Sequence, residues 1–452
     1  MNTNPTAEWT VMIYMNAEPD GFDFSLKKTL KEISLTGSSD KINIITLIDR
    51  NPRKTNIVKD RENGYSLPSI FRIEKNKKIR IDTSSLKKIK NDELGSPRVL
   101  KEFLDFCEQN FPANKFMLCF WDHGACNALF ASPDPGSPNG GTQNFLYITE
   151  VSKAIKNSKI KKVDIITFDA CCMQMLENAY TLKDSTDFMV GSENLISMEG
   201  LGYYMFFKYL NNAPQLSPEE VARLLIKSSY LKVTDKTDNE DKKDIDKKIP
   251  GNAEALEKLY YNKIFDDKTF TLSCLRLKNL EVLIEKIDKL AKALVQFQDD
   301  ELFKYIRYSR FLCQSFYDED EPPMYNSKTI DFIYFLKKLL DTKFERGDKT
   351  EFTGILELAN QIIEYTEMNF IAYREISPYM REESVKAKKW GAQGFSMFFP
   401  EFPFEWKSYK KIGGWYSKVG GQTRMPFVND TTWGKFFERY FDYVERSIAD
   451  SW

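Results

Sequence analysis

The sequence predicts an α/β protein with a mostly parallel β-sheet sandwiched by helices, and with a largely helical section toward the C-terminus. In roughly the first half of the chain, continuous apolar runs that favour β-structure alternate with amphipathic helical patterns. The apolar runs lack the in–out alternation of a half-exposed sheet, and this is typical of strands buried on both faces. After about residue 230 the strand-like runs become sparse and helical patterns dominate.

The first half shows each strand-like run separated from the next by a helical pattern or by turn-forming residues. The runs are WTVMIYM (9–15), KINIITLID (41–49), KFMLCFW (115–121), KVDIITFD (162–169) and DFMVGSE (187–193). The helical patterns are SLKKTLKEIS (25–34), SPRVLKEFLDFCEQNF (96–111), EVSKAIKNS (150–158) and CMQMLENAYTL (172–182). Ser96 and Pro97 are favoured at the start of a helix, so we expect the second helix to begin there.

The sequence patterns of the second half of the chain predict mainly helices. A strand over 269–277 precedes an amphipathic helix over 280–297, further helices are expected over 329–340 and 354–365, and strand character returns over 392–400. These patterns divide the chain into four sections. They are an α/β core (1–233), a charged flexible loop (234–255), a largely helical section (256–385), and a C-terminal strand and helix that pack back on the core (386–452).

Charge and cysteine usage exclude several classes of protein. The chain has 65 Lys and Arg against 66 Asp and Glu, so no basic excess points to nucleic acid. No apolar run reaches ~18 residues, so we expect no membrane span, and the N-terminus lacks the pattern of a signal peptide. Seven scattered cysteines without a CxxC pair, and a single histidine, predict no metal site. No cofactor is required by the sequence, and the oligomeric state is left open.

The residues suited to chemistry follow two of the predicted strands. His123, the only histidine, comes directly after KFMLCFW, and Cys171 follows VDIITFDA. The carboxyl ends of parallel strands form the ligand crevice of such a sheet, so the two residues share a cleft if their strands are neighbours. An imidazole can lower the pKa of a thiol and carry its proton. The N–H groups of Gly124 and Cys171 would then form an oxyanion hole. A structural histidine and a buried core cysteine are the alternatives.

Segments spread in order over nearly the whole chain resemble the clostripain family of cysteine peptidases, in the caspase–gingipain–legumain clan. The matching segments are WTVMIYMNAEPD, NDELGSPRVLKEFLDF, FMLCFWDHGA, DIITFDACCMQMLENAY, GSENLISMEGLGYY, TLSCLRLKNLEVLIEKI and GAQGFSMFFP. The resemblance implies a caspase-like fold with His123 as the catalytic histidine and Cys171 as the nucleophile. In the family pattern the nucleophile follows Asp-Ala, and this selects Cys171 over Cys172.

The resemblance also implies an endopeptidase that cleaves peptides or proteins after Arg or Lys. Asp169 would help to form the S1 pocket, because a buried carboxylate suits a cationic side chain. The segment SENLISMEG (192–200) would wall that pocket, so Ser192 and Glu199 are further candidates. A helix N-cap is the alternative for Asp169, and an exposed loop position is the alternative for Glu199.

Three features depart from the family pattern. Cys172 doubles the cysteine, either as a core residue or as a partner that traps an oxidised nucleophile. Residues 124–152 contain no Lys or Arg, so self-cleavage beyond the histidine is not expected, and the Lys-rich run 234–252 is the better candidate for a nick. Glu199 stands where the family pattern leads us to expect Asp, which weakens the case for a basic P1 residue.

Two other functions compete with the peptidase. One is a binding protein that keeps the peptidase fold without turnover, and the other is an acyl or amide transferase that uses the same dyad. Calcium is an option to which no residue is assigned, because the acidic patches do not form an EF-hand loop. The resemblance favours an extracellular or cell-envelope location, while the missing signal peptide leaves the cytoplasm as the alternative.

Overall fold

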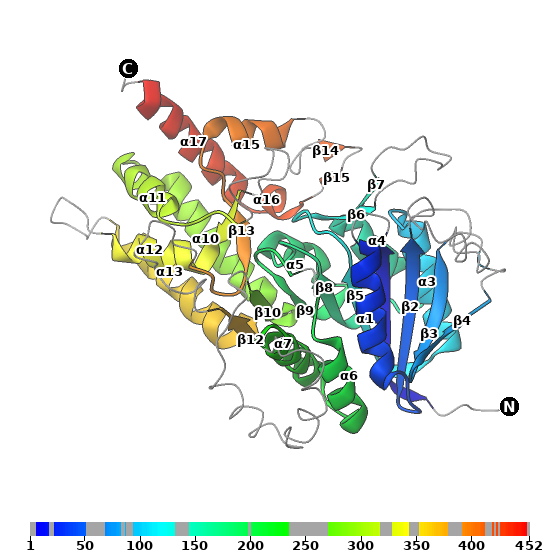
Figure 1. The fold of residues 1–452 in the computed structure, drawn as a ribbon. Helices are drawn as coiled ribbons and strands as arrows, with labels where there is room; N and C mark the ends of the chain where they lie inside the picture. The colour runs from blue at the N-terminus through cyan, green and yellow to red at the C-terminus, as the bar shows by residue number, and fades with distance from the viewer. Residues whose placement is uncertain are drawn as a thin grey trace.

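The computed structural model describes residues 6–17, 22–50, 68–82, 86, 94–131, 144–197, 200–234, 270–316, 328–342, 352–377, 391–411, 418–419, 422–423 and 425–449. Within these ranges a nine-stranded sheet runs through the molecule in the order β12-β10-β9-β8-β5-β1-β2-β3-β4 (Figure 1). The first and the second half of the chain both contribute strands to it.

The centre of the sheet is parallel. Its strands are β1 (Ala7–Ala17), β2 (Ile42–Arg50), β5 (Ala113–Trp121), β8 (Val163–Asp169) and β9 (Thr186–Ser192). Antiparallel strands extend both edges. They are β3 (Ser69–Glu74) and β4 (Lys77–Arg80) on one side, and β10 (Thr271–Arg276) and β12 (Ile371–Ile376) on the other. The strands predicted over the first half of the chain are confirmed.

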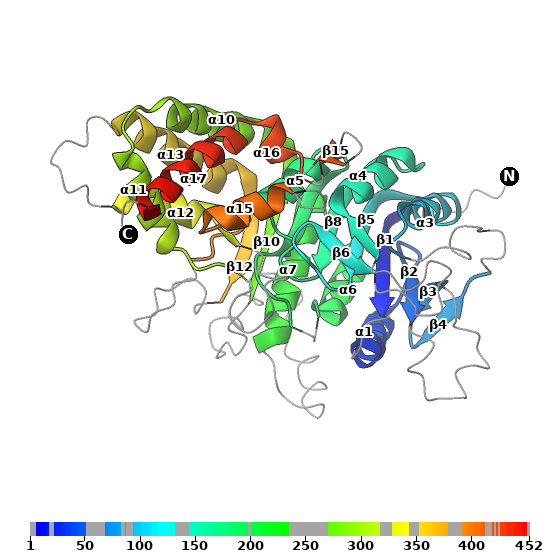
Figure 2. The ribbon, with the colours of Figure 1, turned by 90° about the horizontal axis from the view of Figure 1, so that it is seen from above.

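Helices cover both faces of this sheet. One face carries α1 (Phe22–Thr36), α6 (Tyr203–Asn212) and α7 (Pro218–Thr234), and the other carries α3 (Pro97–Asn110), α4 (Ile148–Asn157) and α5 (Leu176–Leu182) (Figure 2). Successive strand residues enter opposite cores: Met12 packs in one and Ile13 in the other. Because both faces of the strands are buried, their sequences are continuous apolar runs. The predicted α/β sandwich is confirmed.

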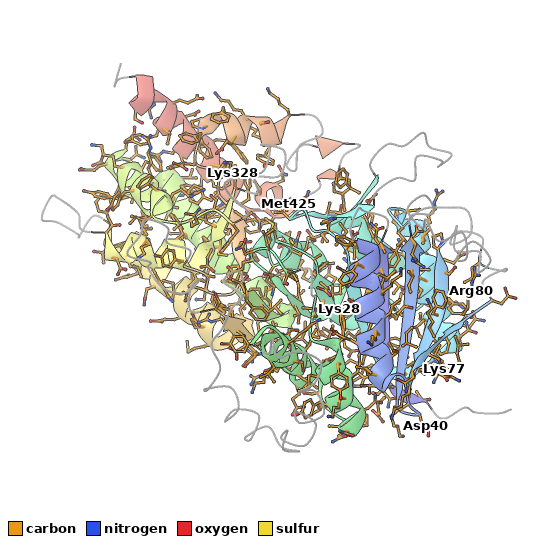
Figure 3. All side chains as sticks on the ribbon, viewed as in Figure 1. Lys28, Asp40, Lys77, Arg80, Lys328 and Met425 are labelled. Atoms are coloured by element: carbon orange, nitrogen blue, oxygen red, sulfur yellow. The ribbon has the colours of Figure 1, made fainter. Side chains whose placement is uncertain are left out.

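A largely helical section lies beyond strand β10 (Figure 1). Its helices are α10 (Leu280–Gln296), α11 (Glu301–Phe311), α12 (Phe332–Asp341), α13 (Thr353–Tyr365), α15 (Pro403–Lys410), α16 (Phe427–Asp430) and α17 (Trp433–Ala449), with the short turns η2 (Leu277–Asn279) and η3 (Thr366–Phe370). Small two-stranded sheets pair β11 (Thr329–Asp331) with β13 (Ser396–Phe398), β6 (Ala128–Ala131) with β7 (Asn144–Tyr147), and β14 (Lys418–Val419) with β15 (Gln422–Thr423). Figure 3 shows how far this section extends: Lys328, just before β11, lies far from Lys77 and Arg80 on the opposite edge strand β4.

Three predicted elements differ from the structure. The helix expected over 329–340 begins only at Phe332, because Thr329–Asp331 form strand β11 and the Asp331 side chain caps the helix by accepting the Tyr334 N–H. The helix expected over 172–182 begins only at Leu176, because Cys172 adopts a left-handed φ of 58° and the Gln174 N–H donates to the Ser192 carbonyl. The strand expected over 392–400 is only three residues long, and it pairs with β11 instead of joining the central sheet. All three segments carry local apolar patterns, but backbone groups in them bond to distant partners.

The division of the chain into four sections stays a prediction. Strands β10 and β12, which come from the predicted helical section, belong to the same sheet as the N-terminal strands. The charged loop predicted over 234–255 lies outside the described residues, apart from Thr234 at the end of α7. Among the described residues, no helix combines the length and the apolar character that crossing a membrane requires.

Arg310 on α11 should be important for the stability of the helical section. Its buried guanidinium donates to the carbonyls of Phe399 at 2.6 Å and Cys313 at 3.1 Å. Arg310→Met removes these donors, and each buried carbonyl left without a partner costs about 1–3 kcal/mol. Chemical denaturation should show the loss, whereas Arg307→Met, at an exposed position of the same helix, should change the free energy of unfolding far less. Equal effects of the two changes would contradict this role.

Candidate active site

The structure brings the segments that carry His123 and Cys171 side by side. Strands β5 and β8 are neighbours and parallel, with Trp121 opposite Asp169 at their carboxyl ends. The Asp122 N–H continues the pairing by donating to the Asp169 carbonyl at 3.3 Å. The two strands are therefore adjacent, as a shared cleft requires, and both candidate residues follow them at the same edge of the sheet.

Gly124 packs directly on the backbone of Cys171. A Cβ atom added to Gly124 would lie 2.0 Å from the Cys171 carbonyl oxygen and 2.8 Å from its nitrogen. Only glycine permits this approach, because no side-chain atom fits between the two backbones. The two predicted oxyanion donors, the N–H groups of Gly124 and Cys171, thus belong to backbone segments in direct contact. Their catalytic role stays a prediction.

His123 is solvent-accessible and is held from two sides. Its ring lies against the Phe22 ring, with centroids 4.3 Å apart. Its backbone N–H donates to Asp122 Oδ1 at 2.6 Å, and the same oxygen accepts from the buried Asn16 side chain at 3.1 Å. The surrounding protein partly desolvates the imidazole and lowers the pKa of His123. The neutral imidazole is thereby favoured near pH 7, in the form that accepts a proton.

Cys171 is partly exposed, and its sulfur is contacted by the main chain of Ile196. The Ile196 N–H donates to Sγ at 3.3 Å, and the thiol lies 3.9 Å from the Ile196 carbonyl. Burial raises the pKa of the Cys171 thiol to about 11. The sequence suggested that the imidazole lowers this pKa, but in this conformation burial is the largest influence and raises it. Burial therefore favours the neutral form of both the Cys171 thiol and the His123 imidazole.

Cys172 faces the core. It is buried, its N–H donates to the Asn194 carbonyl at 3.1 Å, and its thiol is hydrogen-bonded to that of Cys126. The left-handed backbone at Cys172 turns the chain between the two adjacent cysteines. Consequently the two neighbours in sequence have different surroundings, and of the two only Cys171 is accessible.

Asp169 is a buried carboxylate with neutral bonded partners. Its Oδ2 accepts from the Tyr203 hydroxyl at 2.8 Å and from the Leu201 N–H at 3.2 Å. Burial raises the pKa of Asp169 to about 6, so the group is mostly ionised at pH 7. The helix-cap alternative does not hold, because the residue at the N-cap of α5 is Met175.

Of the other two candidates for the S1 pocket, the structure describes Ser192 but not Glu199. Ser192 ends β9 and is buried, with its hydroxyl 2.8 Å from that of Thr271 and accepting the Asn194 N–H at 3.2 Å. Glu199 lies outside the described residues. The S1 roles of Asp169, Ser192 and Glu199 all stay predictions.

Four residues at this edge of the sheet are ones that sequence reasoning did not single out. Asn16 and Phe22 support the histidine segment, while Ile196 and Tyr203 contact Cys171 and Asp169. All except Phe22 lie within segments that carry the family resemblance, but a ring contact or a backbone N–H leaves no pattern in a sequence. Cavities of about 410 and 580 Å³ lie at α13 and beside α3, and no candidate residue lines either. Within the described ranges, no cluster of three or more His, Cys, Asp or Glu could hold a metal ion.

The family model described as the Clostripain family, Peptidase C11, matches residues 13–439. The chain belongs to the clostripain family. Clostripain from Hathewaya histolytica is 29% identical over 229 residues, which are 46% of this chain and 43% of clostripain. The match thus spans less than half of that relative. The predicted class, a clostripain-like cysteine peptidase and hence a hydrolase, is confirmed at the level of the family.

Solved structures share the fold of this clostripain family member. A secreted C11 cysteine protease from Bacteroides thetaiotaomicron, in complex with an irreversible peptide inhibitor, has a TM-score of 0.56 and 17% identity, over 91% of this chain and 98% of that one. An inactive zymogen C11 protease from Parabacteroides distasonis also has a TM-score of 0.56 and 17% identity, over 90% and 96% of the chains. At such identities the likeness supports the fold, and the residue roles need their own tests.

The contact between Gly124 and Cys171 makes a prediction about Gly124→Ala. The added methyl group forces the two backbones apart, and a displacement of about 1 Å at a reacting centre costs on the order of 100-fold in rate. We expect the rate at which a peptidyl acyloxymethyl ketone modifies Cys171 to fall by about that factor. Gly354→Ala is the control, since a Cβ there meets nothing within 4 Å. An unchanged labelling rate in Gly124→Ala would show that this approach is not needed for reactivity.

The raised pKa of Cys171 predicts how its reactivity depends on pH. Only the thiolate is alkylated, so iodoacetamide should modify Cys171 roughly ten times faster for each pH unit between pH 7 and 9. Mass spectrometry of the modified peptide measures this rate, with Cys171→Ala as the blank. A plateau at neutral pH would instead indicate a preformed thiolate–imidazolium pair.

Proposed function

We propose that this chain is a cysteine endopeptidase in which Cys171 is the nucleophile, His123 is its acid–base partner, and the cleaved bond follows Arg or Lys. The observation that carries the proposal is the packing of Gly124 on the Cys171 backbone, since it sets the segment of the only histidine against the accessible cysteine. The membership of the clostripain family supports the same chemistry.

The proposed reaction begins from the neutral pair. The Cys171 sulfur attacks the scissile carbonyl carbon as the thiol proton passes to His123, and the N–H groups of Gly124 and Cys171 receive the oxyanion. The imidazolium then protonates the leaving amine, and a thioester remains on Cys171. A water molecule gives its proton to His123 and attacks the thioester, which releases the carboxylic product and returns the proton to the sulfur.

The charge at Asp169 supports the preference for a basic P1 residue. Its bonded partners, Tyr203 and Leu201, are neutral. The nearby cation Lys232 is itself paired with Glu32 at 3.0 Å and donates to the Leu201 carbonyl. A buried carboxylate in this setting gains from an incoming guanidinium or ammonium group.

The place where the protein acts, and whether calcium takes part, also belong to this proposal. A structural relative from Bacteroides thetaiotaomicron is a secreted protease, and we propose that this chain likewise acts outside the cytoplasm on protein or peptide substrates. Each step above uses residues of this chain, and calcium has no assigned ligand. Labelling in the presence of a chelator and of added calcium therefore belongs in the first experiment.

That experiment is labelling with peptidyl acyloxymethyl ketones that carry Lys or Arg at P1, against Leu and Asp at the same position. Mass spectrometry locates the adduct, and Cys171→Ala and His123→Ala are tested alongside. An adduct on Cys171 that is selective for basic P1 residues and lost in both variants supports the whole proposal. No adduct under any condition, including with added reductant, would favour the binding protein. Product analysis separates hydrolysis from acyl transfer.

Asp169→Asn tests the specificity. The amide oxygen can still accept from Tyr203 and Leu201, but the charge that would pair with the substrate is gone. We expect kcat/KM for Lys and Arg substrates to fall roughly ten- to hundredfold, the value of a charge-assisted hydrogen bond of about 1.5–3 kcal/mol, with less effect at a Leu P1 residue. Asp164→Asn, on the same strand β8, is the matched control. Equal losses for all P1 residues would remove Asp169 from the S1 pocket.

The pKa of Asp169, raised to about 6, adds a pH dependence to that test. The group is protonated below this value, so KM for basic substrates should rise as the pH falls through 6. The same rise should be absent in Asp169→Asn. A wild-type KM that stays constant between pH 7 and 5 would argue against the pairing.

A further inference from the structure

Two buried carboxyl groups meet behind the candidate active site. Glu193 follows strand β9, Asp331 ends strand β11, and each is 1% exposed. Glu193 Oε2 accepts the Gly394 N–H at 2.9 Å, and Asp331 Oδ2 accepts the N–H of the preceding residue, Gln393, at 2.7 Å. The two carboxyl groups therefore bind adjacent peptide groups and act on each other electrostatically, although 138 positions separate them in the sequence. Lys328, labelled in Figure 3, marks the segment of the helical section that leads to Asp331.

The bonding of the two carboxyl groups is unequal. Asp331 accepts two backbone N–H groups, from Tyr334 at 2.6 Å and from Gln393 at 2.7 Å. Glu193 accepts one, from Gly394 at 2.9 Å, through Oε2. Its other oxygen, Oε1, meets no donor among the described residues. Two acceptor oxygens can face each other in the interior only if a proton lies between them.

The surrounding charges do not replace that proton. The cation that acts on both carboxyl groups is Arg374 on β12, which donates to the Gln393 carbonyl and pairs with Glu367 at 3.0 Å. The Lys337 ammonium group on α12 donates to Gln393 Oε1 at 2.9 Å. The charge of Asp331 also acts on the nearby Cys313. Burial raises the pKa of the Cys313 thiol to about 12, so this thiol does not titrate near neutral pH.

The bonding pattern indicates which group carries the proton. Asp331 has two N–H donors that stabilise its negative charge, whereas Glu193 has one. Burial and the neighbouring Asp331 both raise the pKa of Glu193 well above its usual range. Burial also raises the pKa of Asp331, but its two N–H donors oppose that shift, so we assign the proton to Glu193.

A short chain of contacts links Glu193 to the nucleophile. The N–H groups of Glu193 and Asn194 both donate to the Thr271 hydroxyl, at 3.1 and 3.2 Å. The Asn194 carbonyl accepts the Cys172 N–H, and the Ile196 N–H reaches the Cys171 sulfur at 3.3 Å. The segment 193–196 thus holds the backbone next to the nucleophile and contacts the sulfur itself.

We propose that Glu193 and Asp331 share one proton and act together as positioning residues, which tie the segment 193–196 against Cys171 to the helical section. The inference deepens the proposed function and rests on the role of Cys171 given there. Ionisation of Glu193 sets two carboxylates against each other, and the repulsion loosens this segment. Substitution of Glu193 by Gln preserves the contact, because an amide donates to Asp331 and accepts from Gly394 without a titrating proton.

Protein stability gives the first readout, independent of any peptidase activity. Because the pKa of folded Glu193 is raised, the stability that it contributes is fully present below its unfolded pKa of about 4.3 and is lost as the pH rises through the folded value. Glu193→Gln has no such loss. The Tm of Glu193→Gln minus that of the wild type should therefore increase from pH 5 to pH 8, by about 2 °C or more. Infrared difference spectra should lose the band of a protonated carboxyl group.

Labelling of Cys171 gives the second readout. Glu193→Ala should slow modification by acyloxymethyl ketones about tenfold or more at every pH, because the segment at the sulfur is released. At high pH, where Glu193 ionises in the wild type, Glu193→Gln should be labelled faster than the wild type, because Gln does not ionise. Asp331→Asn should be damaging, since an amide cannot accept both N–H groups on its two ends. Glu281→Gln, a surface partner of Lys183, is the control for both readouts.

The two readouts separate failure of this proposal from failure of the proposed function. The Tm comparison is made in the Cys171→Ala background as well, where no covalent chemistry occurs. A Tm difference that does not change between pH 5 and 8, or an unchanged infrared band, overturns the shared proton. If the Tm shifts as expected but Glu193→Gln and Glu193→Ala are labelled at the same rate, the positioning role is overturned. If Cys171 is never labelled in the wild type, the proposed function fails, and the positioning role fails with it.

Discussion

The close approach of two backbone segments at one edge of the sheet is the constraint on which the candidate site depends. Strands β5 and β8 are adjacent, and the Asp122 N–H carries their pairing past the end of β5. Gly124 then rests on the Cys171 backbone without a side chain between them. The Phe22 ring, tilted by 42° against the His123 ring, contacts the first of these two segments, and the Ile196 N–H contacts the second.

Burial sets the electrostatics of the site, and it acts differently on each group. Desolvation raises the pKa of the Cys171 thiol and lowers that of the His123 imidazole, and both shifts favour the neutral forms. Asp169 is also buried, but its two donors hold its pKa at about 6, so it keeps its charge at neutral pH. Glu193 has one N–H donor, and in the proposed pair with Asp331 it is the group that carries the proton. The candidate site at this end of the sheet therefore combines a neutral thiol and a neutral imidazole with the negative charge of Asp169.

The helical section is hydrogen-bonded to the segment that follows Cys171. The Ser396 N–H donates to the Gln174 carbonyl at 2.9 Å, and the Phe398 N–H donates to Glu177 at 2.9 Å. The Gln174 side chain bonds in turn to Ser273 on β10. Through these bonds the segment that follows Cys171 contacts both strand β10 of the central sheet and strand β13. The tertiary structure therefore assigns a supporting role to a section that contributes no candidate catalytic residue.

The sequence by itself determined the class of fold and the strands of the sheet centre, and it singled out His123 and Cys171 as the candidates for chemistry. Continuous apolar runs reveal strands buried on both faces, and a single histidine leaves few choices. The sequence also carried the family resemblance, and with it the choice of Cys171 over Cys172. Only the tertiary structure decided that β5 and β8 are neighbours, that α5 starts as late as Leu176, and that Glu193 meets Asp331. The physical reason is that burial and hydrogen bonding between distant segments set backbone conformation and protonation, and neither leaves a local pattern in the chain.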